Sequence, residues 1–331
     1  SRSGGNSTEA AKTVVIAKPS HHEQRPAEQH MTDVVPRHEH AKAPAASSLT
    51  MKEAEENTGQ TVSGGGGSGK FLGPGAQSSF EAMAAGLGAQ VGLAVEPLGS
   101  EEVVEFGSLL QSGHAWSSIK PAILSTVMKE QGESLGPEEE AWAEGAITAS
   151  DNEDAAALFH AIEGRQGGLD GASAAVGETI HEGGSMSTVV ATAPPPAGAV
   201  STFGQTDWPV GEAVRFYHGL ATCRVHGTSY IEGLMENVIG EQRWGLGQAT
   251  FPAEPRVGMK GGWGPDTEAD GGYVVRQSGF VQNKEGGIAV AMIAVDESGS
   301  YPAGAEDLSA IAQWLARELK GYGPAYPGCT G

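Results

Sequence analysis

The order of strand-like and helix-like segments constrains this chain most, because strands occur near both ends of its apolar part. Apolar residues alternate at 91–95 and recur at 103–106 on either side of a Pro-Leu-Gly-Ser turn, which predicts a β-hairpin. Two further strand-like runs lie at 272–280 and 287–295. A single antiparallel sheet built from both ends of the chain, flanked by helices and with a helical lobe inserted, satisfies this order. We therefore predict an α+β fold, α/β-like in its layering.

Helical spacing fills the middle of the chain and closes it. In the last helical segment Leu308, Ile311, Leu315 and Leu319 share one face. The Gly-, Ser- and Pro-rich stretch 165–206 is instead predicted to be a long surface loop with short helical pieces. The helices are expected at 117–130, 137–163 with a break at 150–152, 210–220, 229–239 and 305–319.

Composition divides the chain into an arm and a body. Residues 1–70 hold five of the ten histidines, many small or polar residues and few large apolar ones. Such a segment buries too little apolar surface to offset the entropy lost on ordering. We predict an extended or disordered arm and linker at 1–75, a main domain at 76–320 and a C-terminal tail at 321–331.

The net charge belongs to the body. Residues 1–70 carry 8 Lys/Arg and 8 Asp/Glu, which leaves the whole −21 to the remainder. A strongly acidic body argues against nucleic acid or an anionic membrane surface as partner. The chain has no run of about 18 apolar residues, so no transmembrane segment is expected.

The start of the chain and its cysteines bear on where the protein works. The sequence begins at Ser1 with no visible signal peptide, which suggests a mature, processed protein that is secreted or held in the cell envelope. Cys223 and Cys329 are the only cysteines. A bridge between them and two free thiols are equally expected, since two is the smallest number that permits a pair.

Three short motifs carry nucleophile chemistry. They are Ser-Ser-Ile-Lys at 117–120, Ser-Asp-Asn at 150–152 and Lys-Gly-Gly at 260–262. Three residues apart on a helix places Lys120 on the same face as Ser117. A partly desolvated lysine has a lowered pKa and accepts the serine proton, and a helix N-terminus favours the developing negative charge. Taken singly, each motif is better explained by helix-capping serines and a solvated lysine.

Together and in this order, the motifs resemble those of the serine β-lactamase and penicillin-binding superfamily. The segment 139–164, which contains Ser-Asp-Asn, is similar to its counterpart in class A β-lactamases. Lys-Gly-Gly-Trp-Gly at 260–264, followed by two strands and a helix, resembles how those enzymes end, and 204–209 resembles the end of their Ω loop. The likeness covers about 240 residues and looks nearest to actinobacterial serine hydrolases that share Arg-Trp-Gly-Leu-Gly at 243–247.

The resemblance implies a role for each motif residue. Ser117 would be the acylated nucleophile and Lys120 its base. Ser150 would pass a proton to the leaving nitrogen, Asn152 would bind a substrate amide, and Lys260 would orient Ser150 and attract a substrate carboxylate.

Two further positions complete the implied site. The backbone N–H groups of Ser117 and Trp263 would form the oxyanion hole, because such donors stabilise a tetrahedral intermediate. Gly262 and Trp263 are therefore grouped with Asn152 as substrate-binding positions. No cofactor and no metal are implied.

Three departures from the class A pattern bear on turnover. No Glu-x-x-Leu-Asn motif occurs at 165–208, where Glu178 and Glu182 lack the required neighbours. Gly261 replaces the threonine of Lys-Thr-Gly, and only 29 residues separate Lys120 from Ser150. These differences predict a more open cleft and slow loss of an acyl group from the serine.

Two functions fit this sequence. The first is a secreted serine hydrolase that acylates Ser117 with a β-lactam or a peptidoglycan-like amide, so its partner is a small-molecule or peptide substrate. The second is a non-catalytic β-lactamase-like accessory or structural subunit of a cell-envelope assembly, docked through residues 1–70. A β-prone stretch at 14–16 is the expected contact of that arm with a protein partner.

Two weaker patterns are set aside. Gly-x-x-x-x-Gly-Lys at 64–70 lacks the following Ser/Thr and a preceding strand, so nucleotide binding is not predicted. The arm histidines at 21, 22, 30, 38 and 40 are explained by a polar arm better than by a metal site.

Overall fold

The computed structural model describes residues 71–265 and 272–329. The predicted arm at 1–70, with its histidines, its β-prone stretch at 14–16 and its Gly-rich motif at 64–70, lies outside the described residues. Phe71 and Leu72, which belong to the linker predicted at 1–75, have buried side chains, and Leu72 forms a β-bridge with Leu319.

The described residues include one five-stranded sheet. Its order is β2-β1-β5-β4-β3, and every neighbouring pair is antiparallel. The two N-terminal strands lie beside the three C-terminal ones, which confirms the predicted sheet built from both ends of the chain. The strands are β1 (Ala89–Pro97), β2 (Val104–Gly107), β3 (Arg256–Pro265), β4 (Tyr273–Gln282) and β5 (Gly287–Asp296).

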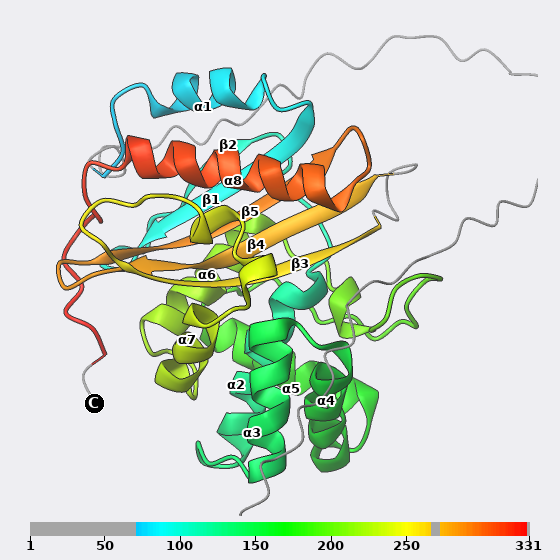
Figure 1. Ribbon diagram of the computed structural model, residues 1–331. Helices are drawn as coiled ribbons and strands as arrows, with labels where there is room; N and C mark the ends of the chain where they lie inside the picture. Colours follow the sequence, from blue (N-terminus) through cyan, green and yellow to red (C-terminus); the bar gives the residue numbers. More distant parts are fainter. Residues whose placement is uncertain (1–70, 266–271, 330–331) are drawn as a thin grey trace, which may run out of the picture. The chain divides into compact units, whose positions relative to one another are not determined.

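Helices cover both faces of this sheet (Figure 1). On one face lie α1 (Ala76–Ala84) and α8 (Tyr301–Glu318), and on the other lies the helical lobe, with α6 (Val210–Ala221) directly against the strands. Seven consecutive β5 residues from Ile288 to Ala294 are fully buried, because each face of the strand meets a helical layer. This coverage explains the uninterrupted apolar run of β5.

The outer helical layer begins with a helix that the sequence did not predict. We expected strands to open the domain, but α1 precedes β1. Only Ala76 and Phe80 of α1 are buried, so its apolar face is too short to stand out in the sequence. Phe80 contacts Phe106 and Trp314 with ring centroids 5.3 and 4.9 Å away, which holds α1 against β2 and α8.

The helical lobe lies between β2 and β3 in the sequence, as predicted. Its centre is α2, in which every residue from Lys120 to Met128 is buried. The predicted break at 150–152 is confirmed, since α3 ends before a π turn (Gly145–Ala149) and α4 starts at Asn152. The helices are α2 (Lys120–Glu130), α3 (Pro137–Glu144), α4 (Asn152–Gln166), α5 (Leu169–Glu182) and α7 (Thr228–Glu236).

One prediction for the lobe is wrong in part. The stretch 165–206 was expected to be a loop, but its first half contains the 14-residue α5. Ala172, Val176 and Ile180 form a buried stripe at four-residue spacing on this helix. Glycines within α5 weakened that pattern in the sequence.

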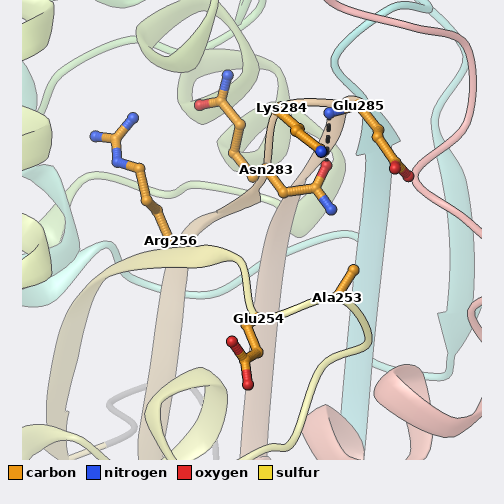
Figure 2. Close-up of a pocket in the computed structure, with 7 residues that line it drawn as sticks. Ala253, Glu254, Arg256, Asn283, Lys284 and Glu285 are labelled. Atoms are coloured by element: carbon orange, nitrogen blue, oxygen red, sulfur yellow. Dashed lines mark hydrogen bonds between the residues drawn. The ribbon is translucent and has the colours of Figure 1, made fainter.

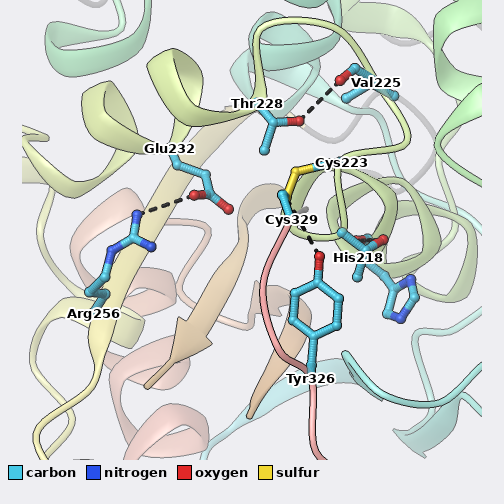
Figure 3. Close-up of a disulfide and its surroundings, with 9 residues drawn as sticks. His218, Cys223, Val225, Thr228, Glu232, Arg256, Tyr326 and Cys329 are labelled. Atoms are coloured by element: carbon cyan, nitrogen blue, oxygen red, sulfur yellow. Dashed lines mark hydrogen bonds and ion pairs between the residues drawn. A yellow bond between two sulfur atoms is a disulfide. The ribbon is translucent and has the colours of Figure 1, made fainter. Parts of the chain in front are cut away.

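A disulfide joins Cys223, after α6, to Cys329 near the end of the chain (Figure 3). Their Cα atoms are 5.8 Å apart, which is normal for a bridge. The tail is also held by Tyr322, whose hydroxyl donates to the Pro252 carbonyl over 2.6 Å. Of the two alternatives left open by the sequence, the structure has the bridge.

We expect loss of this disulfide to destabilise the fold. The bridge closes a loop with a sequence separation of 106 residues, so its removal restores much chain entropy to the unfolded state. The free energy of unfolding of a Cys223→Ala/Cys329→Ala protein, measured with urea, should fall by about 2–5 kcal/mol. An unchanged urea midpoint and slope would show that the disulfide contributes nothing to stability.

A buried carboxyl and imidazole pair lies next to the disulfide. Glu96 at the end of β1 and His218 on α6 are 1% and 2% exposed, with Oε1 and Nδ1 3.9 Å apart. Burial raises the pKa of Glu96 to about 7 and lowers the pKa of His218. His218 is labelled beside the bridge in Figure 3.

This pair predicts a pH-dependent stability. The folded state holds the Glu96 proton between about pH 4.5 and 7 while the unfolded chain releases it, so the Glu96 contribution to the free energy of unfolding falls as pH rises through that window. The lowered pKa of His218 acts in the opposite direction, because the unfolded imidazole takes up a proton that the folded one does not. Glu96→Gln should remove up to about 3 kcal/mol of this fall. Chemical unfolding at pH 5 and pH 8 checks it, with Glu81→Gln on the exposed face of α1 as the control. Equal slopes in wild type and Glu96→Gln would contradict the assignment.

Candidate active site

Ser117 lies in a tight turn that leads into α2. A 3₁₀ helix (Trp116–Ile119) precedes Lys120, and Trp116 has a left-handed φ of 48°. Ser118 donates from its hydroxyl to the Ala115 carbonyl over 2.6 Å, and both neighbours of Ser117 in this turn are buried. Ser117 itself is only partly buried, so its side chain is the one in the turn that remains accessible.

Lys120 is buried and donates into the Ser-Asp-Asn loop. Its Nζ lies 2.7 Å from the Ser150 carbonyl oxygen, 3.3 Å from Ser150 Oγ, 3.1 Å from the Asp151 carbonyl oxygen and 3.0 Å from Asn152 Oδ1. Burial lowers the pKa of Lys120 to about 7, against the opposing charges of Asp151 and Asp154. The first two sequence motifs therefore meet in space.

The amine of Lys120 does not bond to the nucleophile in this structure. Among the described residues its hydrogen-bond acceptors all belong to 150–152, and Ser117 Oγ is not one of them. Proton transfer from Ser117 requires the neutral amine to turn its lone pair toward Oγ. Contacts of this kind are commonly long before substrate binds.

The third motif meets the other two at the Ser150 hydroxyl. Lys260 Nζ donates to Ser150 Oγ over 2.8 Å and to the Gly261 carbonyl over 2.9 Å. Burial, and next the nearby Lys120 charge, hold the pKa of Lys260 well below its usual range. Ser150 has a left-handed φ of 59°, which turns the chain sharply between the π turn and α4. Its Oγ accepts from two lysines, so its own proton is available for donation.

The start of α4 fixes this loop. Asp151 Oδ1 accepts from the backbone N–H groups of Glu153 and Asp154 at 2.8 and 3.0 Å and so caps the helix. The acidic residue of the motif is therefore used structurally, while Ser150 and Asn152 face the lysine.

Strand β3 packs directly against the nucleophile turn through glycines. A Cβ on Gly262 would lie 2.8 Å from the Ala115 carbonyl oxygen and 2.9 Å from the backbone nitrogens of Ser117 and Ser118. A Cβ on Gly264 would lie 2.3 Å from the Trp116 ring. Only glycine permits this approach, so Gly262 acts here by close backbone contact.

Trp263 extends to the opposite face of β3. Its ring packs against Tyr301 and Trp244, with centroids 5.0 and 6.2 Å away, on the α8 side of the sheet. The ring is thus directed away from the Ser117 turn. Trp263 can therefore contribute to the site only through its backbone N–H group.

The segment before α6 is bonded to the turn before Ser117. The Ala115 N–H donates to the Thr206 carbonyl over 2.8 Å, and the Trp208 N–H donates to the Gly113 carbonyl over 2.9 Å. Asp207 Oδ1 accepts from the Gly113 N–H over 2.9 Å. Asp207 is the only acidic residue at 183–209, so the carboxylate of this segment is already used by the backbone.

Glu178 and Glu182 lie elsewhere. Both pair with Lys129, at N–O distances of 3.2 and 2.6 Å. Lys129 follows Lys120 by nine residues on α2, which is about 13 Å along a helix. The structure therefore places neither glutamate with the three motifs.

A surface hollow lies at the other end of β3. It is lined by Ala253, Glu254, Arg256, Gln282, Asn283, Lys284 and Glu285 (Figure 2). Arg256 and Gly262 are six residues apart on an extended strand, or about 20 Å. The hollow is therefore separate from the cluster around Ser150.

Comparison with known proteins supports the fold through structure alone. No family model matches the chain, and no curated protein matches it by sequence. A chromosome-encoded β-lactamase of Vibrio parahaemolyticus is similar over 73% of this chain and 98% of its own, with 13% identity and a TM-score of 0.57. A class A β-lactamase from Bacteroides cellulosilyticus is similar over 73% and 98%, with 18% identity and a TM-score of 0.56.

A β-lactamase from Xanthomonas campestris is similar over 73% of this chain and 97% of its own, with 13% identity and a TM-score of 0.56. The narrower resemblance to actinobacterial serine hydrolases stays a prediction. No helix in the described part of the chain is long and apolar enough to cross a membrane. This chain therefore has the fold of class A β-lactamases.

Proposed function

We propose that this protein is a serine hydrolase that forms an acyl-enzyme at Ser117 with a β-lactam or a peptidoglycan-like amide and releases the acyl group slowly. The observation that carries the proposal is the buried cluster of Lys120, Ser150 and Lys260 beside the Ser117 turn. Lys120 and Lys260 both donate to the Ser150 hydroxyl, and burying both of them as cations is costly. Burial therefore lowers the pKa of each lysine and favours a neutral amine at neutral pH. A neutral amine next to a serine is a general base.

The proposed acylation conserves every proton. Lys120 Nζ takes the proton of Ser117 Oγ as Oγ attacks the carbonyl carbon, and the backbone N–H groups of Ser117 and Trp263 stabilise the oxyanion. The C–N bond then breaks as the leaving nitrogen takes a proton from Ser150 Oγ. Ser150 is reprotonated by Lys120, which completes the transfer from Ser117 to the leaving group. Asn152 binds the substrate amide, and Lys260 holds Ser150 and attracts a substrate carboxylate.

Slow release of the acyl group follows from what the segment 183–209 lacks. Hydrolysis of the ester needs a base that activates water. The only carboxylate of the segment, on Asp207, accepts from the Gly113 N–H instead. Lys120 is neutral again once acylation is complete. The segment 183–209 offers no second base that could position and activate the water.

The disulfide supports a location outside the cytoplasm. Bridges such as Cys223–Cys329 persist mainly in oxidising compartments. We propose a secreted or envelope-bound protein whose residues 1–70 engage a protein partner.

One observation favours the second function, a non-catalytic accessory subunit. Lys120 donates wholly within 150–152 and makes no hydrogen bond to Ser117 Oγ in the described part of the chain. A cluster that only stabilises the fold would also look like this. Labelling of Ser117 distinguishes the two functions.

The test is covalent labelling followed by mass spectrometry. A fluorophosphonate probe and benzylpenicillin should each add one group per molecule, located at residue 117 by peptide mapping. Ser117→Ala should abolish both adducts, whereas Ser118→Ala should keep them, because Ser118 is buried and bonded to the Ala115 carbonyl. No adduct from either reagent on folded wild-type protein would favour the accessory subunit.

A further inference from the structure

Arg276 on β4 is a fully buried cation that binds only backbone oxygens among the hydrogen bonds of the described chain. Its Nη1 donates to the Gly113 and His114 carbonyls over 2.9 and 3.0 Å, and its Nη2 donates to the Trp208 carbonyl over 2.9 Å. Burial lowers its pKa to about 10, so it remains charged at neutral pH. A guanidinium without a carboxylate partner is costly to bury. Its hydrogen bonds to the three carbonyls offset part of that cost and hold the segments that carry them.

The carbonyls that Arg276 binds come from two separate segments. Gly113 and His114 belong to the turn before Ser117, and Trp208 belongs to the segment before α6. The guanidinium also lies over the Trp208 ring, 6.0 Å from its centroid. Arg276 thus joins the nucleophile turn, the segment at 206–208 and the sheet at one point.

The same peptide groups are held from their other side. The peptide between His114 and Ala115 accepts from Arg276 through its oxygen and donates to the Thr206 carbonyl through its nitrogen. The Gly113 carbonyl accepts from both Arg276 and the Trp208 N–H. Because a peptide is planar, fixing both of its ends fixes its orientation.

A second buried donor holds the far side of the turn. The Tyr217 hydroxyl on α6 donates to the Ser118 carbonyl over 2.6 Å. With Arg276 before Ser117 and Tyr217 after it, carbonyls on both sides of the nucleophile are bound. The peptide that carries the Ser117 N–H lies between these two anchored positions.

We propose that Arg276 is a positioning residue for acylation at Ser117. It sets the orientation of the Ser117 N–H and Oγ by holding the 113–114 carbonyls, and it keeps the 206–208 segment in register with them. This inference rests on the proposed function for its kinetic consequence, but the coupling of the two segments is measurable without any substrate.

The test combines hydrogen exchange with labelling kinetics. In Arg276→Met, peptides covering 113–118 and 203–209 should both exchange at least tenfold faster, because the contact that joins them is lost. Benzylpenicillin acylation should slow about 10–100-fold at saturating reagent, with little change in the concentration that gives half the maximal rate. Arg276→Lys, which keeps a charge and three donors, should restore part of both effects.

Arg256→Met provides the matched control. Arg256 is an exposed β3 arginine paired with Glu232 and Glu236, and its loss should leave both exchange and labelling unchanged. Unchanged exchange at 113–118 and 203–209 in a folded Arg276→Met or Arg276→Gln protein would overturn the proposal, whatever the labelling shows. Altered exchange in a protein whose wild type is never acylated would leave the coupling intact and refute the proposed function instead. Should Arg276→Met fail to fold, Arg276→Gln takes its place, with Arg276→Lys kept as the variant that restores part of the effect.

Discussion

Replacing Lys120 by methionine should slow acylation of Ser117 by about 10²–10⁴-fold, the usual contribution of a general base. Methionine fills similar space without an amine, so the serine proton has no acceptor in the buried cluster. The fold should survive with a lower melting temperature, because an apolar side chain suits a position that is 1% exposed but leaves the buried oxygens of 150–152 without their donor. The rate constant for fluorophosphonate labelling, measured beside a thermal melting curve, checks both statements.

The pH dependence of wild type gives the same base an independent signature. Lys120 acts only as the neutral amine, and its pKa lies at about 7. The labelling rate should therefore fall about tenfold per pH unit below 7 and level off above it, with a midpoint that belongs to the coupled pair of lysines. A rate that is flat from pH 5 to pH 8 would exclude Lys120 as the base.

Lys129→Met is the control for the helix. Lys129 also lies on α2, but at the partly exposed C-terminal end of the helix, where its amine pairs with Glu178 and Glu182. It should label at the wild-type rate across the whole pH range. Equal slowing in Lys120→Met and Lys129→Met would point to damage to α2 rather than to loss of a base.

Replacing Gly262 by valine should cost at least 10²-fold in the acylation rate. The new side chain would enter space already occupied by the Ala115 carbonyl and by the Ser117 and Ser118 nitrogens, which are backbone atoms that cannot rotate away. The Ser117 turn must then shift, and a displaced oxyanion donor typically loses 10²–10³-fold. Gly262→Ala should show a smaller loss in the same direction.

Gly164→Ala separates this effect from a general intolerance of glycine substitution. A Cβ on Gly164, in α4, meets nothing within 4 Å, and the helix should gain a little stability. The labelling rates and melting temperatures of Gly262→Val, Gly262→Ala and Gly164→Ala distinguish a local effect at the Ser117 turn from a general loss of stability. A Gly262→Val protein that labels like wild type would contradict the close packing of β3 on the nucleophile turn.

Much of the fold was predictable because its signals are local. The alternation in β1 and β2, the apolar run of β5 and the spacing in α8 all depend on neighbours in the sequence. The helix α5 was missed because glycines interrupt its stripe, and α1 was missed because only two of its residues are buried. Their stability comes from tertiary contacts that no local pattern reveals.

The candidate site likewise combines residues that local motifs predict with residues that only tertiary contacts reveal. The motifs identified Lys120, Ser150 and Lys260, and the structure brings these three together in one hydrogen-bonded cluster. The sequence did not reveal Arg276 or the contact of Gly262 with Ser117, because each of them reaches the Ser117 turn from more than 140 residues away. A charged residue within the apolar strand 273–282 was the one available signal for Arg276.

The central claim is that Ser117 acquires an acyl group quickly and loses it slowly. The most direct measurement is a pulse of benzylpenicillin at pH 8 followed by dilution, with intact-protein mass spectra taken through both phases. We predict one Ser117-bound acyl group per molecule, formed faster than it is lost, with little hydrolysed product beyond one equivalent. Rapid hydrolysis with no accumulated adduct, or a folded protein that never acquires the adduct, would contradict the claim.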